Sequence, residues 1–349
     1  MARPLRCEYA GGWFHVTGRG NERRRIFKDD RDRDRFVSLL GELEGRYGLE
    51  IHGYVLMDNH YHLLVKMVED WGLSAGMQFL GVSYSVWYNR RHQRSGHLFQ
   101  GRFKAVVVDI IEWGVSLSRY IHLNPVRTKR HGLDKETRMA GRQGMGEEVG
   151  REVVQERLKS LREYRWSSYP AYCGWTERPE WLHDSEVLEG FGKGSRGRRE
   201  YRKYVEEAIR SGREESPWEN LIGGLVLGGE ELLEKVREKA KGNSAEQPSL
   251  RAISQRLGVE KIVEIVSRIK GERWEEYGKR RGDWGRAMVL MAARRKSGMT
   301  NRMLAERLGG KDDSAVTQAV KRLESRMKAD HKLARIFQRV EKEMSNVKM

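Results

Sequence analysis

The sequence predicts an α+β fold, in which a split β-α-β domain with a central antiparallel sheet precedes an all-α domain. Two observations support this. The first 125 residues alternate strand-like and helix-like patterns in the order β-α-β-β-α-β-α, and almost everything beyond residue 250 has helical spacing. Because 349 residues exceed one ordinary core, we expect a first domain at residues 1–135, an extension packed on it at residues 136–240 and a helical domain at residues 250–335.

The first domain begins with a β-rich run at residues 12–17, followed by a basic loop. A helix comes next, which Asp29 or Asp30 can cap at its start. Gly48 is expected to end this helix, because glycine is common just past a helix end. These elements form the first β-α unit.

The rest of this domain repeats the alternation. Two β-rich runs at residues 49–57 and 60–68 predict a hairpin. Ser74 can cap the following helix, and residues 102–110 and 112–124 read as a further strand and helix. We expect the helices to cover one face of the antiparallel sheet.

The middle of the chain is less regular. Residues 135–150 are rich in glycine and charge, which predicts an exposed insertion, and residues 190–199 are expected to form a mobile basic loop. The aromatic stretch at residues 163–175 is expected to pack on the first domain. The loose segment at residues 241–249 is the preferred boundary before the helical domain.

The chain is strongly basic, with 67 lysines and arginines against 50 acidic residues and a formal net charge of +17. Solubility alone needs only a modest charge of either sign. A polyanionic partner is therefore expected, and nucleic acid is the first candidate.

Only Cys7 and Cys173 occur, which excludes a disulfide framework and a cysteine-ligated zinc site. The first residues contain no apolar signal-peptide core, and no apolar run reaches the length of a membrane span. We expect a cytoplasmic, nucleoid-associated protein.

His60 and His62 are two residues apart in a predicted strand, so their side chains leave the same face of the sheet. Two such imidazoles can hold a divalent cation if another element supplies a third ligand. The alternative is that they are two polar residues on a half-exposed strand.

Tyr120 and Asn124 share one face of a predicted helix, on the same stripe as Trp113 and Leu117. This stripe is expected to face the sheet, where a tyrosine is either an ordinary core residue or a nucleophile. Asn124 precedes Pro125, which disfavours helical geometry at Asn124. Its amide oxygen is a plausible third ligand beside the two imidazoles.

The sequence resembles the HUH single-strand nucleases with one catalytic tyrosine, and within them the REP-associated tyrosine transposases. The resemblance covers residues 8–235. Its carrying segments are HVTGRGNERRRIF, YVLMDNHYHLLV, GHLFQGRFKAVVVD, YIHLNPVR and YRWSSYPAY.

The resemblance implies a ferredoxin-like catalytic domain, a Mg²⁺ or Mn²⁺ ion on His60 and His62, and cleavage of single-stranded hairpin DNA, a REP-like repeat, by Tyr120 through a 5′-phosphotyrosine. Asn124 stands where the wider group carries a glutamine as third metal ligand. Arg19, Asn21 and Arg102 are implied to grip the DNA.

Further basic side chains are expected to follow the phosphates. They are Arg23, Arg24, Arg90, Arg91 and Lys104. The alternative is that single arginines merely solvate helix ends.

Residues 299–328 read as helix, glycine-containing turn, helix, which is typical of a helix-turn-helix. The segment resembles the duplex-binding domain of the replication initiator DnaA, although Asp313 and Ala315 replace polar base-reading residues there. Duplex DNA is therefore an expected second partner. Candidate contacts are Lys311, Ser314, Thr317 and Gln318. The alternative is a helical hairpin used only for packing.

Together these features predict a metal-dependent transposase of the strand-transferring kind, either a monomer or a homodimer. Two rivals remain open. One is a sequence-specific DNA-binding regulator that no longer cuts, and the other is a hydrolytic metallonuclease in which the metal activates water.

Overall fold

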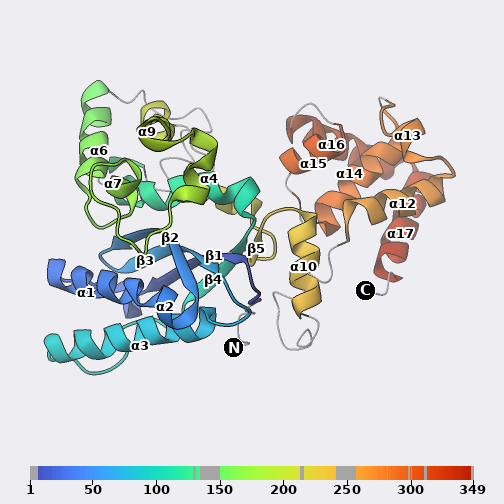
Figure 1. Ribbon diagram of the computed structural model, residues 1–349. Coiled ribbons are helices and arrows are strands. Elements are labelled where there is room, and N and C mark those ends of the chain that lie inside the picture. The colour runs from blue at the N-terminus through green and yellow to red at the C-terminus, as the bar shows by residue number, and fades with distance from the viewer. Residues whose placement is uncertain are drawn as a thin grey trace. The chain divides into compact units, whose positions relative to one another are not determined.

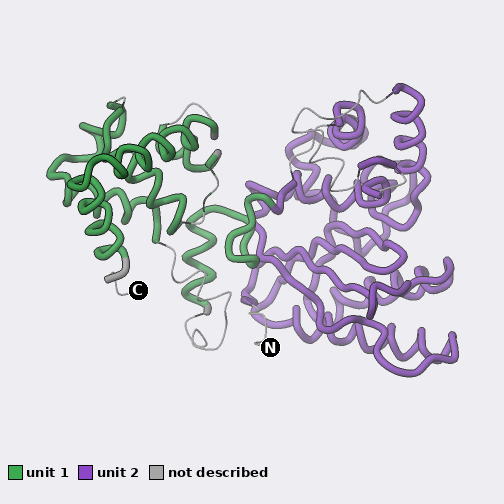
Figure 2. Tube along the Cα trace, turned by 180° about the vertical axis from the view of Figure 1, so that it is seen from behind, with its two compact units in different colours: residues 1–5, 219–349 green, residues 6–218 purple. Residues whose placement is uncertain are grey.

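The computed structural model describes residues 7–128, 131–133, 150–212, 216–240, 257–280, 282–297, 299, 301–309 and 313–346. The chain separates into two compact units (Figure 2). We call residues 6–218, purple in the figure, the first unit, and the green unit, which contains residues 219–349, the second unit. The expected boundary at residues 241–249 and most of the expected insertion at residues 135–150 lie outside the described residues.

The first unit is built on an antiparallel sheet of β1 (Gly12–Arg19), β2 (Leu49–Met57), β3 (His60–Met67) and β4 (Lys104–Val108). These strands lie in the order β2-β3-β1-β4. All three pairings between neighbours are antiparallel. This order is that of a ferredoxin-like split β-α-β domain, as the sequence predicts.

Helices cover both faces of this sheet (Figure 1). The helices α1 (Asp30–Gly41), α2 (Leu43–Tyr47) and α3 (Leu73–Arg91) lie on one face, and α4 (Ile110–Leu123) lies on the other. The expectation of helices on a single face is therefore wrong. Its physical reason is visible in β3, where consecutive residues are buried on both sides of the strand and both faces need cover.

Two helix ends differ from expectation. Gly72, rather than Ser74, precedes α3, with a φ of 136° that side chains other than glycine rarely adopt. The Ser74 hydroxyl instead donates to Glu8. At the end of α4, Asn124 keeps helical dihedrals despite the following proline, because Pro125 begins a short 3₁₀ turn, Asn124–Val126, that continues the spiral.

The described part of the first unit also contains α6 (Arg151–Glu163), α7 (Tyr169–Tyr172), α8 (Ser185–Leu188) and α9 (Gly194–Ser211). The aromatic stretch packs on the sheet as expected, since the backbone N–H of Leu56 donates to the Trp166 carbonyl at 2.9 Å. Residues 194–199 belong to α9 and are not a loop, because its buried face, including Tyr201 and Val205, holds it against the core.

The second unit is largely helical. Its elements are β5 (Val226–Leu227), α10 (Glu230–Ala240), α12 (Val259–Lys270), α13 (Trp274–Tyr277), α14 (Trp284–Lys296), α15 (Asn301–Arg307), α16 (Asp313–Ala329) and α17 (His331–Asn346). Ile262, Val289, Leu304 and Val320 share its apolar core. Among the described helices, none has the length and apolar character needed to cross a bilayer.

Candidate active site

His60 and His62 lie on β3 and project from the same face of the sheet. Strand pairing places Arg19 directly opposite His60 and Thr17 opposite His62. His62 is only 8% exposed, and His60 is half-buried. Burial lowers the pKa of His60, and it lowers the pKa of His62 still further, with help from the neighbouring His15. Both rings are therefore neutral near pH 7, as metal ligation requires.

One nitrogen of each ring is already occupied. The Nδ1 atom of His60 lies 2.7 Å from the amide oxygen of Asn59. The Nδ1 atom of His62 lies 2.9 Å from Nε2 of His15, a buried side chain on β1. The Nε2 atom of each ring is thus the one left to meet a ligand.

Sequence reasoning missed His15. The signal was present, because His15 is two residues from Thr17 and so shares its face of β1. That His15 reaches His62, however, depends on the register between β1 and β3, which the sequence alone does not give.

Tyr120 comes from α4, on the sheet face that carries the histidines. Its ring meets the His62 ring edge-on, with 5.7 Å between centroids. The Trp218 ring lies 5.1 Å from it, and the Arg127 guanidinium lies 4.1 Å from its centroid. The structure thus brings Tyr120 and His62 together, and adds Arg127 and Trp218.

A buried polar network fixes α4 in place. His122 Nδ1 lies 2.7 Å from the Tyr201 hydroxyl, and its Nε2 lies 2.7 Å from the Ser168 hydroxyl. Burial lowers the pKa of His122 to about 3, so this ring is neutral. Since α9 and the segment before α7 supply the partners, both hold the helix that carries Tyr120.

Asn124 lies one turn after Tyr120. Its amide nitrogen donates to the Tyr120 carbonyl at 2.8 Å and to the Ile121 carbonyl at 3.3 Å. The amide nitrogen therefore completes the helix end, and the amide oxygen is the atom available to a metal. Two neutral imidazoles and one amide oxygen would form an uncharged donor set, which leaves the full charge of a divalent ion for a phosphate.

A second cluster of possible ligands lies at the opposite end of β3. Single ligand atoms of Glu50, His52 and Glu186 come within 4.8 Å of one another. The Lys66 ammonium, however, lies 3.2 Å from a carboxylate oxygen of each glutamate. A side-chain cation thus already balances this cluster.

The predicted DNA-binding residues near β1 are mostly accessible. Arg19 is exposed and donates through Nε and Nη2 to Gln100. Lys104 is exposed and pairs with Thr17, which puts it on the sheet face of His62. Arg23, Arg24 and Arg102 are exposed and Asn21 is half-buried; Arg24 pairs with Glu22 at 2.6 Å.

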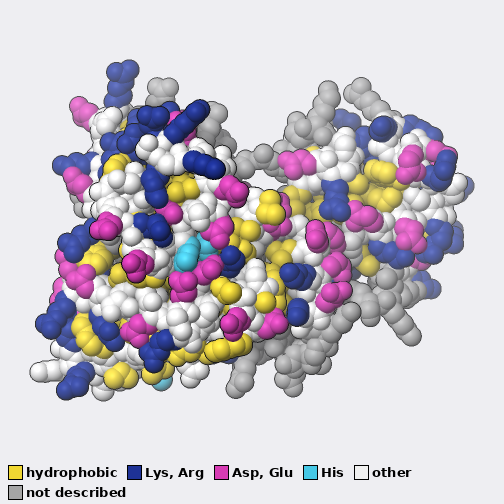
Figure 3. All heavy atoms as spheres, viewed as in Figure 1, with side chains coloured by type: hydrophobic (Ala, Val, Ile, Leu, Met, Phe, Trp, Pro, Cys, Tyr) yellow, Lys and Arg dark blue, Asp and Glu magenta, His cyan; other side chains and the backbone are white. Residues whose placement is uncertain are grey.

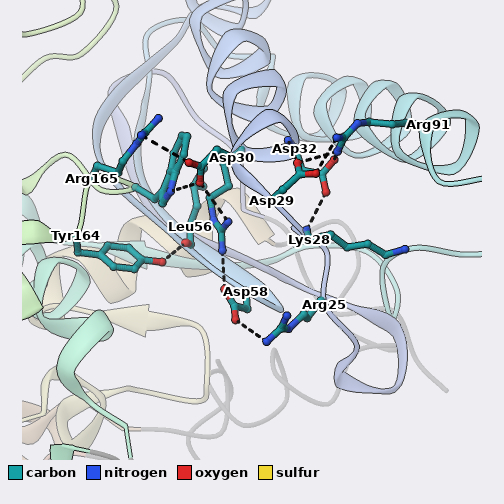
Figure 4. A network of polar contacts seen from close by, with 12 residues as sticks. Arg25, Lys28, Asp29, Asp30, Asp32, Leu56, Asp58, Arg91, Tyr164 and Arg165 are labelled. Atoms are coloured by element: carbon teal, nitrogen blue, oxygen red, sulfur yellow. Dashed lines mark hydrogen bonds and ion pairs between the residues drawn. The ribbon is translucent and has the colours of Figure 1, made fainter.

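On α3, Arg90 is exposed, whereas Arg91 is engaged in a polar network (Figure 4). The Arg91 guanidinium donates to both carboxylate oxygens of Asp29 and to buried Asp32. These carboxylates raise the pKa of Arg91. Arg91 thus joins α3 to the start of α1, and its predicted phosphate contact would have to break these pairs.

In the second unit, Ser314 and Gln318 are exposed on α16, and Thr317 is half-buried with its hydroxyl bound to Asn301 at 2.9 Å. Lys311 lies outside the described residues.

In the first unit, Figure 3 shows lysine and arginine side chains gathered over α6 and α9, whereas both signs of charge intermix lower on the same face.

Comparison with known proteins finds a family and a solved structure to which this chain is similar. Residues 9–124 match the family described as "Transposase IS200 like". A solved structure titled "Structure of the REP associates tyrosine transposase bound to a REP hairpin" covers 56% of this chain and 97% of its own, at 17% identity and a TM-score of 0.35. No curated protein matches the chain.

The matched family comprises metal-dependent DNA nucleases and transposases that act through a tyrosine. The match ends at Asn124, so it contains His60, His62 and Tyr120 but neither Arg127 nor Trp218. Residues 9–124 of this chain are thus similar to the IS200-like transposases.

Proposed function

We propose that this protein cuts and rejoins single-stranded DNA, with Tyr120 as the nucleophile of a metal-dependent strand transfer. The observation that supports this most directly is the edge contact between the Tyr120 and His62 rings, 5.7 Å apart, on the sheet face that also carries His60. An ordinary core tyrosine needs no such neighbours, and Tyr120 is only half-buried.

The chemistry follows from these side chains. The Tyr120 hydroxyl attacks the phosphorus, the bond from phosphorus to the 3′-oxygen breaks, and the 5′-phosphate stays on the tyrosine while a 3′-hydroxyl leaves. His60, His62 and Asn124 would hold Mg²⁺ or Mn²⁺, which when bound withdraws charge from the phosphate and orients it. The Arg127 guanidinium, over the ring, favours the negative charge that develops on the phenol oxygen.

We propose hairpin-forming repeat DNA as the substrate, because the motifs around Tyr120 resemble a family that cuts such DNA. Exposed Arg19 and Lys104 share the sheet face of the histidines and suit the flanking phosphates. The α15–α16 pair in the second unit is proposed to bind duplex DNA through Ser314, Thr317 and Gln318.

The test uses the full chain, Mn²⁺ and a hairpin-bearing single strand labelled at its 3′ end, because the 3′ fragment is the one that stays on the tyrosine. The wild type is expected to form a covalent protein–DNA adduct that survives denaturing gel electrophoresis. Tyr120→Phe should reduce adduct formation by at least about 10³-fold, since no other group replaces a lost nucleophile efficiently. Tyr204→Phe is the matched control, because that tyrosine also lies under an arginine, Arg119, but away from the histidines.

Each contrary outcome identifies a rival. Cleavage that persists in Tyr120→Phe but disappears in His60→Ala would indicate a hydrolytic metallonuclease. Tight DNA binding by the wild type without any adduct would indicate a regulator.

A further inference from the structure

His60 and His62, the two histidines proposed to bind the metal, are each held by a hydrogen bond at Nδ1. For His60 the partner is the amide oxygen of Asn59. The amide nitrogen of Asn59 donates to the Arg23 carbonyl at 3.0 Å, which fixes which end of the amide faces the ring. An amide oxygen can only accept, so His60 must carry its proton on Nδ1 and leave the Nε2 lone pair free.

For His62 the partner is another imidazole, His15, with 2.9 Å between Nδ1 of His62 and Nε2 of His15. Either ring can donate. If His15 donates, neutral His62 carries its proton on Nε2 and has no free lone pair. If His62 donates, its Nε2 lone pair is free, and only this arrangement permits a metal bond.

The surroundings hold His15 firmly. Its side chain is 4% exposed, the Trp218 ring lies 4.7 Å away, and the Tyr120 ring lies 6.3 Å away at a right angle. A ring confined in this way keeps its Nε2 atom directed at His62.

We propose that His15 and Asn59 are positioning residues that keep His62 and His60 protonated on Nδ1, with both Nε2 atoms directed to the metal. The metal itself belongs to the proposed function, whereas the two tautomers are properties of the protein without metal. Hydrogen-bond partners of ligating histidines fix the ring and its proton, and losing one typically weakens metal affinity about 10–100-fold.

The tautomers are measured first, in the metal-free full chain labelled with ¹⁵N-histidine. Long-range ¹H–¹⁵N spectra assign each ring by comparison with His60→Gln and His62→Gln. Protonated Nδ1 and unprotonated Nε2 are expected for both rings. A proton on Nε2 of His62 would overturn the role of His15, and a proton on Nε2 of His60 would overturn that of Asn59.

Mn²⁺ affinity, measured by electron paramagnetic resonance of the free ion, separates positioning from packing. His15→Leu should weaken Mn²⁺ binding about 10–100-fold, while His15→Gln, whose side-chain oxygen can still accept from His62, should recover most of the loss. For His60 the corresponding variants are Asn59→Leu, which should weaken Mn²⁺ binding, and Asn59→Asp, which keeps an acceptor oxygen and should recover most of the loss. His92→Leu removes an imidazole bound to Asp32 on the other side of the sheet and should leave Mn²⁺ affinity unchanged.

Equal affinity in His15→Leu and wild type would overturn the proposal for His15. If the leucine variants do not fold, the wild-type spectrum and the glutamine and aspartate variants still decide it. Absence of Mn²⁺ binding in the wild type, with both rings protonated on Nδ1, would instead contradict the metal-dependent function and leave the hydrogen-bond assignment standing.

Discussion

At the residue scale, the site consists of a few side chains with distinct tasks, and Arg127 is the one whose contribution is easiest to isolate. Its guanidinium stacks on the Tyr120 ring, and its Nη1 donates to the Tyr120 carbonyl at 2.9 Å. It thus both orients Tyr120, the proposed nucleophile, and places a positive charge beside its ring.

Arg127→Met should slow adduct formation about 3–30-fold, because a cation over an aromatic ring contributes about 0.5–2 kcal/mol. Single-turnover rates with saturating hairpin DNA measure this. Arg119→Met, which removes an equivalent stacking between an arginine of α4 and Tyr204 of α9, should keep the wild-type rate. A similar slowing in both variants would mean that the effect comes from α4 as a whole and not from Arg127.

The site could be predicted from sequence only where the pattern is local. His60 and His62 are recognisable by their period of two, and Tyr120 and Asn124 by their spacing on one helix. His15, Arg127 and Trp218 were not predicted, because each reaches the site through strand register or chain reversal. Arg91 is the converse case. The sequence predicts that it contacts a phosphate, but in the structure it is held by two carboxylates that lie about sixty residues away in the chain.

At the element scale, the start of α1 combines a helix cap with an ion pair. The Asp29 carboxylate accepts from the backbone N–H of Asp32 at 3.1 Å and pairs with Arg91 at 2.7 Å. The hydrogen bond from Arg91 lowers the pKa of Asp29 to about 2. Stability from this lowered pKa is therefore present above about pH 4 and is lost as pH falls towards 2.

Asp29→Asn keeps the cap but removes the charge, so at pH 7 it should cost at most about 1 kcal/mol, the usual limit for an exposed pair. Asp29→Ala removes both and should cost about 1 kcal/mol more. Urea unfolding at pH 7 and pH 3 measures this. If Asp29→Asn and Asp29→Ala lower the free energy of unfolding by the same amount, the helix cap makes no separate contribution to stability.

Most elements of the first unit were predicted because their signals are local, such as the Asp29 cap and the hairpin at Asp58-Asn59. The placement of α4 on the second face was not predicted, since it depends on burial on both sides of β3. The sequence GFGKGSRGRR reads as a loop, yet α9 begins at Gly194, because tertiary packing of Tyr201 and Val205 outweighs the poor helix propensity of its first residues.

At the scale of the whole molecule, buried neutral histidines make the first unit sensitive to acid, and His52 is one of them. His52 is fully buried, and burial lowers its pKa to about 4, although Glu186 and Glu50 act to raise it. Lys66 and His183 also face this cluster. Since the unfolded chain binds this proton near pH 6.5, stability is full above that value and falls by about 3 kcal/mol as pH drops to 4.

The two cysteines, Cys7 and Cys173, both belong to the first unit and report its unfolding separately from the second. The urea concentration at the midpoint of unfolding can be measured by pulse labelling of these cysteines with a thiol reagent. This midpoint should decrease when the pH is lowered from 6.5 to 4.5, and it should decrease less in His52→Gln. An equal fall in both proteins would assign the acid sensitivity to other groups.

The position of Trp218 has an evolutionary consequence. The proposed nucleophile, Tyr120, and the proposed metal ligands lie inside the segment that matches the transposase family, whereas Trp218 and Arg127, which line the same tyrosine, lie beyond it. Substitutions at these two lining positions would therefore alter the surroundings of Tyr120 and leave the matched segment unchanged. Descendants of one ancestral nuclease can in this way acquire different DNA preferences without any change in their chemistry.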